Sequence, residues 1–398
     1  MTLLLLLLIA ASACKQPLFD NLERDAPVAD RTPQPPLTRD TTQAGIKVHA
    51  TAIVFPDSVD WRAGDTHGAK LILFQNGKAS GSLSIEGRPD PDKHRFQDGH
   101  IWTFSGDGSR TTISCDGSPL FTYAGEETLV GFLVADGKVH TLGQRAGGGF
   151  SYRVDGQEVF SSAVGTVLGT SARPEREGGS VTLDGSDICY AYALPVQGTD
   201  DESLWEYRVM QGGKLLKSIP AVSDVKLYDI LVHQGEVYRL EYRYGQVCLF
   251  KGENLTPLDL PEESRSLRLV SADGEILVKG CHDEGRDSYY WMRDTDSLRY
   301  QYSARWRHLY DIYADKGELA AVEMDLDDCV VKVVRGQMEV KLGFETYRLH
   351  TPRCVAYRNG IIALAFTGDV KDIENALLIN EELIPVPFNG YFTSIHID

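Results

Sequence analysis

The residues best suited to chemistry in this sequence are an indole flanked by cationic side chains. Trp306 lies between Arg305 and Arg307, and His308 follows directly. A flat aromatic ring can stack on the C–H face of a sugar, while guanidinium groups can hold its hydroxyls. The pattern favours a glycan-binding patch, and packing of the indole between two sheets is the competing interpretation.

A second group of candidates consists of aspartates that follow a recurring turn by eight or nine residues: Asp107, Asp283, Asp325 and Asp369. Carboxylates from several loops at one mouth could attract a cationic group. Aspartate is also a favoured turn residue for reasons of backbone geometry alone. Two of these carboxylates, together with His308, could instead supply the acid and base of a glycoside hydrolase or lyase.

Sequence motifs for catalysis are missing. The chain contains no G-x-S-x-G, H-E-x-x-H or P-loop sequence and no dinucleotide fingerprint. This favours a binding protein over an enzyme, and we expect no cofactor and no metal site.

The cysteines allow two disulfides. Cys248 with Cys281, and Cys329 with Cys354, lie in neighbouring repeats of the kind described below. In an oxidising compartment such pairs can form a bond if their Cα atoms approach within about 7 Å. Buried free thiols are the alternative.

The N-terminus is typical of an exported protein. Residues 3–11 form an apolar run, and Ser12 and Ala13 lead into Cys14. The run is too short to span a bilayer. The segment resembles the lipobox of bacterial lipoproteins, although Ala11 stands where leucine is usual and no basic residue follows Met1.

The lipobox resemblance implies a signal peptide over residues 1–13 and a lipid on Cys14. The proline-rich segment 14–48 has too little apolar content to repay the entropy of ordering, and it is predicted to be a disordered tether. The protein would then be an outer-membrane lipoprotein of the cell envelope, facing the periplasm or the cell surface, with membrane contact through its lipid alone.

The charge balance excludes some partners. The 57 acidic residues exceed the 40 Lys and Arg residues, for a net charge of −17. Nucleic-acid binding needs clustered cations on the protein surface, so we expect no nucleic-acid partner. A hydrophobic content of 42% is enough to build a core.

The elements that must position these residues are strands in a long repeat. A turn with glycine at its centre recurs seven times, and Gly99 and Gly360 are 261 residues apart over six intervals, a mean of 43.5 residues. A second turn follows each of them. The first turns contain Gly99, Gly137, Gly185, Gly235, Gly274, Gly317 and Gly360, and the second Gly117, Gly156, Gly213, Gly252, Thr295, Gly336 and Asn380.

Two hairpins in each repeat predict four strands, here named A to D in chain order. Three further strands precede the first repeat, and residues 391–398 form one more at the end, which predicts 32 strands in eight blades. Residues 49–398 thus resemble a β-propeller, whose blades have this length. The C-terminal strand would complete the N-terminal blade. Seven blades is the alternative, if the weak strands near residues 80 and 180 are loops.

These observations together predict an all-β, lipid-anchored propeller that binds a glycan, a peptide or an envelope protein without catalysis, as a monomer. The envelope glycoside hydrolase or lyase is one alternative. A structural assembly scaffold is another, and exposed apolar patches on the blade edges would be its sign.

Overall fold

The computed structural model describes most of the chain after residue 46. The described ranges are 47–85, 88–168, 181–184, 187–196, 205–220, 225–258, 260, 265–272, 275–282, 288–293, 300–301, 307–315, 318–325, 330–335, 338–345, 352–367, 375–380 and 382–398. Residues 46–398 form one compact unit, and all the described residues belong to it. The predicted signal peptide, Cys14 and nearly all of the predicted tether lie outside the described residues, so these predictions stay predictions.

The described residues form antiparallel sheets and two short 3-10 helices, Trp61–Ala63 and Pro91–Lys93. The first sheet, in its order of pairing, consists of β3 (Lys78–Ser84), β2 (Lys70–Gln75), β1 (Val48–Val54) and β33 (Gly390–Ile397). The second consists of β4 (His94–Gln97), β5 (His100–Gly106), β6 (Arg110–Cys115) and β7 (Ser118–Ala124). The third consists of β8 (Glu127–Ala135), β9 (Lys138–Arg145), β10 (Phe150–Val154) and β11 (Gln157–Ser162).

The remaining sheets follow in chain order. The fourth contains β12 (Thr166–Val167), β13 (Val181–Asp184), β14 (Asp187–Pro195), β15 (Trp205–Gln211) and β16 (Lys214–Ile219). The fifth contains β17 (Lys226–His233), β18 (Glu236–Arg243), β19 (Gln246–Lys251) and β20 (Asn254–Pro257), and the sixth β21 (Arg265–Ala272), β22 (Glu275–His282), β23 (Ser288–Arg293) and β24 (Tyr300–Gln301). The seventh contains β25 (Arg307–Asp315), β26 (Glu318–Asp325), β27 (Val330–Arg335) and β28 (Met338–Glu345), and the eighth β29 (Cys354–Arg358), β30 (Ile361–Phe366), β31 (Ala376–Ile379) and β32 (Glu382–Pro385).

The predicted order of strands is confirmed. In the second to eighth sheets, consecutive strands pair as an antiparallel meander from A to D. The predicted strands near residues 80 and 180 are both strands, namely β3 and β13. The chain is therefore a β-propeller repeat protein, while the number of blades in a closed ring stays a prediction.

One sheet departs from the predicted pattern. In the fourth sheet, β13 pairs with the beginning of β14, and β12 pairs further along the same strand at Tyr192 and Ala193. Strand A of this sheet is thus supplied by two short segments. The sequence analysis identified β13 and missed the two-residue β12, which is too short to show any alternation.

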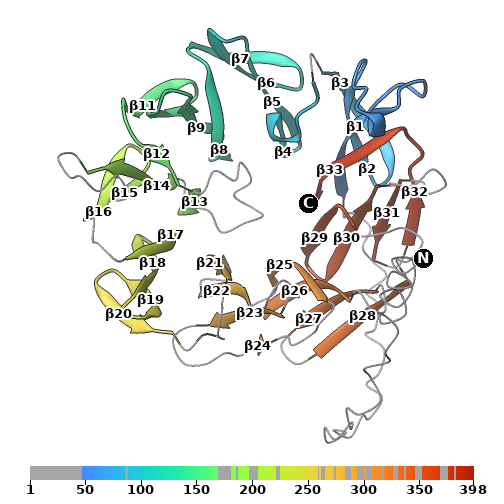
Figure 1. Cartoon of the computed structure of the whole chain (residues 1–398). Helices are drawn as coiled ribbons and strands as arrows, with labels where there is room; N and C mark the ends of the chain where they lie inside the picture. Colours follow the sequence, from blue (N-terminus) through green and yellow to red (C-terminus); the bar gives the residue numbers. More distant parts are fainter. Residues whose placement is uncertain are drawn as a thin grey trace, which may run out of the picture. The chain divides into compact units, whose positions relative to one another are not determined.

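The C-terminal strand lies where the sequence predicts. β33 pairs with β1 from Val48 opposite Ile397 to Val54 opposite Gly390, and Figure 1 shows the red and blue strands side by side. The last residue adds two contacts, because the Asp398 N–H donates to the Lys47 carbonyl and its carboxylate lies 2.8 Å from His49 Nε2. Both ends of the described chain are thus held in one sheet.

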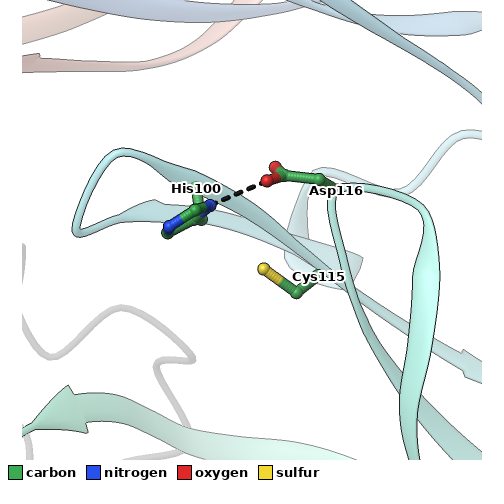
Figure 2. Close-up of side chains that lie close together, drawn as sticks. All are labelled: His100, Cys115 and Asp116. Carbon is green, nitrogen blue, oxygen red and sulfur yellow. Dashed lines mark hydrogen bonds and ion pairs between the residues drawn. The ribbon is translucent and has the colours of Figure 1, made fainter. Parts of the chain in front are cut away.

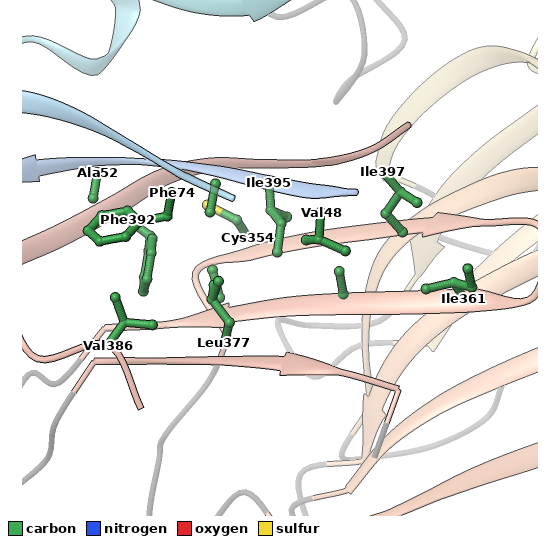
Figure 3. Close-up of a cluster of buried hydrophobic side chains, with 13 residues drawn as sticks. Val48, Ala52, Phe74, Cys354, Ile361, Leu377, Val386, Phe392, Ile395 and Ile397 are labelled. Atoms are coloured by element: carbon green, nitrogen blue, oxygen red, sulfur yellow. The ribbon is translucent and has the colours of Figure 1, made fainter. Parts of the chain in front are cut away.

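Buried apolar side chains join each sheet to the next. One cluster contains Val48, Phe74 and Phe392 of the first sheet together with Ile361 and Leu377 of the eighth (Figure 3). Similar clusters of described side chains join the second sheet to the first and third, the fourth to the third and fifth, the fifth to the sixth, and the seventh to the eighth. The backbones of the sixth and seventh sheets meet where β25 contacts β21 and β23. The side chains of the described D strands are more exposed than those of strands B and C, because a D strand has no neighbouring strand on one edge.

The turn between strands C and D is built in the same way in four sheets. Its first residue is an aspartate or asparagine with positive φ, whose side-chain oxygen accepts the N–H of the residue opposite in strand B at 2.9–3.2 Å. The four pairs are Asn76 with Val48, Asp116 with Ile101, Asp155 with Val139, and Asn380 with Ile362. Asp and Asn tolerate this backbone conformation better than other non-glycine residues.

The glycines of these turns also meet the preceding sheet. A methyl group on Gly156 would lie 2.8 Å from Phe121 Cδ1 of β7, and one on Gly117 would lie 3.0 Å from Leu83 of β3. Gly77 faces Ile384 of β32 in the same way, across the junction of the first and eighth sheets. Glycine is needed here both for its positive φ and for the close approach.

We expect Gly156→Ala to destabilise the protein more than Gly137→Ala does. Both glycines have positive φ, +75° and +69°, but nothing lies within 4 Å of a methyl group at Gly137. The Gly137 variant should lose about 1–2 kcal/mol of unfolding free energy from backbone strain alone. The Gly156 variant should lose about 1–3 kcal/mol more from overpacking. Urea unfolding of both variants measures the difference, and equal losses would show that the contact with Phe121 is unimportant.

Candidate functional site

Several of the predicted site residues lie outside the described residues. These are Arg305 and Trp306 of the predicted glycan patch, and Asp283 and Asp369 of the aspartate group. Arg307 begins β25 and Asp325 ends β26, and these two residues are directly opposite each other in the register. His308 is opposite Met324. The fold therefore brings two of the candidates to one end of the seventh sheet, and their role in binding stays a prediction.

The predicted cysteine pairs are only partly described. Cys248 in β19 is buried, and burial raises the pKa of its thiol. Cys354 in β29 is also buried. The side chain of Cys281 and the whole of Cys329 lie outside the described residues, so both disulfides stay predictions.

Asp107 acts as a turn residue. Its Oδ1 accepts the N–H groups of Ser109 and Arg110 and the Ser109 hydroxyl, each at 2.8 Å. These bonds, that of the Ser109 hydroxyl above all, hold the pKa of Asp107 below its usual value. This carboxylate is engaged within its own loop, which supports the structural interpretation of this aspartate.

Three side chains of metal-ligating type meet at the end of the second sheet opposite to Asp107. This end contains the turn between strands A and B and the turn between strands C and D. His100 begins β5, Cys115 ends β6, and Asp116 is the first turn residue after it (Figure 2). One ligand atom from each lies within 4.8 Å of the other two. His100 and Asp116 are exposed, while Cys115 is partly buried and carries a free thiol. We refer to these residues as the His100 cluster.

Hydrogen bonds orient the His100 cluster. His100 Nδ1 lies 2.7 Å from Asp116 Oδ2, and Asp116 Oδ1 accepts the Ile101 N–H at 2.9 Å. Burial tends to raise the pKa of Asp116, but the hydrogen bonds from His100 and Ile101 outweigh it, so that the pKa is lowered. Burial, and then the charge of Asp116, raise the pKa of the Cys115 thiol.

The His100 cluster was not predicted from the sequence, since the candidate residues were sought in the loops at the other end of the blades. His100 and Cys115 are 15 residues apart and form no known ligand motif. The predicted pairing of strands B and C could have revealed the cluster. That pairing places the residue after the first turn of a repeat close to the residue that begins the second turn.

A second feature is a row of exposed aliphatic side chains on the D strands of four consecutive sheets. Its members, here called the outer row, are Leu120 (51% exposed), Val159 (51%), Leu215 (54%) and Leu255 (38%). Val159 Cγ1 would lie 2.7 Å from a methyl group on Gly213, two residues before Leu215. Strand D of the third sheet thus lies against the turn between strands C and D of the fourth sheet.

Buried charges elsewhere hold the sheets together. Glu127 Oε2 lies 2.6 Å from Arg153 Nη1, with 2% and 6% of these side chains exposed, and the Arg153 guanidinium covers the ring of Tyr123 in the neighbouring sheet at 3.8 Å. Arg239 and Glu241 form a similar pair of 2.8 Å within β18. The Arg153–Glu127 pair is satisfied in the interior, whereas Nε of Arg239 and Oε2 of Glu241 are buried without a hydrogen-bond partner.

Asp229 joins the fifth and sixth sheets. A bulge in β17 precedes it, and its two carboxylate oxygens accept the N–H groups of Ile230 and of Leu269 in β21, each at 2.9 Å. Burial raises its pKa to about 7, although both N–H groups and the charge of Arg268 oppose the shift.

Comparison with known proteins yields similar folds only. No family model and no curated protein matches the chain. Among solved structures, apo AztD from Citrobacter koseri is 14% identical, with a TM-score of 0.46, and the match covers 88% of this chain and 98% of AztD. BamB from Moraxella catarrhalis is 10% identical, with a TM-score of 0.33, and the match covers 71% of this chain and 96% of BamB. The β-propeller domain of the Trilobed protease from Pyrococcus furiosus is 7% identical, with a TM-score of 0.40, and the match covers 72% of this chain and 90% of that domain. At these values the similarity carries no information about function.

The described residues include no helix that is long and apolar enough to cross a membrane.

The raised pKa of Asp229 predicts a pH-dependent stability. The folded-state pKa of about 7 exceeds the value of 3.8 for an unperturbed carboxyl. As pH rises, the unfolded chain therefore loses this proton before the folded protein does. The folded state loses stability as pH rises from about 4 to about 7. The contribution is at most about 4 kcal/mol, since one pKa unit corresponds to about 1.4 kcal/mol. Asp229→Asn should remove it.

The measurement is the free energy of unfolding of wild type and Asp229→Asn at several pH values in that window. We expect the wild type to lose stability relative to the variant as pH rises. A difference that does not change with pH would contradict the assignment.

Proposed function

We propose that the chain is an envelope lipoprotein whose propeller binds another envelope protein through the outer row, as a non-catalytic assembly scaffold. The observation that carries this proposal is the outer row itself, four exposed aliphatic side chains on consecutive D strands. Apolar side chains gathered on one exposed surface are typical of protein interaction sites, and the outer row offers one such side chain on each of four consecutive D strands.

The outer strands have an open edge. Each D strand of the outer row lies at the end of its sheet order, so that one edge of its backbone has no partner within the sheet. Charged residues commonly block such edges, and β16 contains two lysines and β11 contains Glu158, whereas β7 and β20 contain no charged residue. The uncharged edges of β7 and β20 favour a partner that covers these strands.

The chemistry of the outer row favours a protein over a glycan. Leu120, Val159, Leu215 and Leu255 are aliphatic, whereas sugar recognition relies on flat aromatic faces and on polar groups that hold hydroxyls. Aliphatic side chains bury well against apolar side chains of a partner, at about 25 cal/mol per Å² of apolar area. The partner surface should therefore be apolar. Lys214, which precedes Leu215 in β16, is suited to an acidic neighbour, whereas Lys217 already pairs with Glu253.

We expect a photo-crosslinking residue at Leu215 or Val159 to capture a protein in cells. Tyr244 provides the matched control, because it is 79% exposed but lies in the turn between β18 and β19, at the other end of the blades. Leu120→Glu, combined with the crosslinker at Leu215, should weaken capture at least about tenfold, the effect of losing one interface anchor.

Three outcomes would contradict the protein partner. These are equal capture at Tyr244 and Leu215, crosslinks between copies of this chain alone, and binding to a glycan or peptide array that Leu120→Glu leaves unchanged.

The lipid anchor is tested separately. Cys14→Ser should move the protein from the membrane fraction to the soluble fraction, because the lipid is its only proposed membrane contact. Mass spectrometry of the wild-type N-terminal peptide should show an acylated Cys14. An unmodified Cys14 in a membrane-bound protein would contradict the lipoprotein assignment. It would not affect the proposal that the outer row binds a protein.

A further inference from the structure

We propose that the His100 cluster binds a zinc ion through one atom each of His100, Cys115 and Asp116, with a fourth position open to water. This site is distinct from the outer row and goes beyond the proposed function. Imidazole nitrogen, thiolate sulfur and carboxylate oxygen are the three ligand types that zinc takes from proteins.

The distances are suitable for the ion. Zinc bonds of 2.0–2.3 Å in a tetrahedral site place the ligand atoms about 3.3–3.8 Å apart. The three atoms already lie within 4.8 Å of one another, and the shortest separation, His100 Nδ1 to Asp116 Oδ2, is 2.7 Å. The side chains of His100 and Asp116 are more than half exposed, so rotation about their own bonds can open this hydrogen bond without moving the sheet.

A backbone hydrogen bond orients one member of the cluster. Asp116 is one of the four turn residues that bind the N–H of strand B, and this contact uses only its Oδ1. Its Oδ2 is therefore left to face His100. The repeated turn holds the carboxylate in place, and the second oxygen is available to a ligand.

Comparison with the matching turns shows what is particular to the second sheet. In the third sheet, Asp155 binds the Val139 N–H in the same way, but Lys138 and Val154 stand where His100 and Cys115 would be. In the first sheet the three positions are Lys47, Gln75 and Asn76, and in the eighth Ile361, Ile379 and Asn380. The fold requires the aspartate or asparagine in every case, whereas the histidine and the cysteine occur together only here among these four turns.

The same three residue types could also form a nucleophilic triad, in which Asp116 would orient the imidazole through Nδ1 and the other ring nitrogen would take the thiol proton. Among the described residues, however, no hydrogen bond joins His100 to Cys115, whereas one ligand atom from each of the three side chains lies within reach of a shared ion. Zinc binds cysteine as the thiolate, and binding would release the thiol proton to solvent.

The test uses the full-length chain under reducing conditions, with Zn²⁺ measured by competition against a chromophoric chelator. Three variants copy the matching turns of other sheets and so keep the fold: His100→Lys, Cys115→Val and Asp116→Asn. Asp116→Asn retains the oxygen that binds the Ile101 N–H, as Asn380 does for Ile362. Asp155→Asn is the control, because it makes the same change in a turn without the histidine and the cysteine.

We expect the wild type and Asp155→Asn to bind Zn²⁺ equally and each of the three variants to bind at least about tenfold more weakly, since loss of even an outer-shell partner costs 10–100-fold. Co²⁺ in place of Zn²⁺ should give the wild type a near-ultraviolet thiolate-to-cobalt band that Cys115→Val lacks. The affinity should rise with pH, because the thiol must lose its proton.

Three results would overturn the proposal: no Zn²⁺ binding by the wild type, undiminished binding by Cys115→Val, or an equal loss in Asp155→Asn, which would assign the binding to general surface acidity. The cobalt band of the wild type decides the question independently of whether any variant folds.

Discussion

Every sheet of this protein depends on burying its faces against its neighbours. A single four-stranded antiparallel sheet with apolar side chains on both faces cannot form a core alone. Here the shared clusters supply that core, and the one between the first and eighth sheets joins Val48 and Phe392 with Leu377. The pairing of β33 with β1 places side chains from both ends of the chain in this cluster, so the junction is formed by residues more than 300 positions apart.

The turns convert this packing into a regular repeat. An aspartate or asparagine begins the turn between strands C and D in four sheets, and its side chain binds strand B of the same sheet. The following glycine in three of them faces the D strand of the preceding sheet. One short segment therefore stabilises both the hairpin and the spacing of neighbouring sheets, because only a residue without Cβ permits both the positive φ and the contact.

A scaffold built from equivalent positions lets chemistry differ from one sheet to another at little cost to the fold. Asp116 and Asp155 serve the same structural purpose, but only Asp116 has a histidine and a cysteine beside it. The outer row follows the same principle. The D strands pair on one edge only, so Leu120 and Val159 can be exposed there without disturbing the clusters between the sheets.

The sequence by itself determined the all-β class, the four-strand repeat and the place of the last strand, because alternating apolar residues and glycine turns are local signals that survive without tertiary context. It did not reveal β12, which has too few residues to show a pattern, or the outer row, since exposure depends on which strand lies at an edge. Nor did it reveal the His100 cluster. His100 and Cys115 come together only through the register of β5 and β6, and the free oxygen of Asp116 faces them only because its other oxygen is engaged by the Ile101 N–H. Local pattern thus decided which elements form, whereas pairing and packing decided which side chains meet.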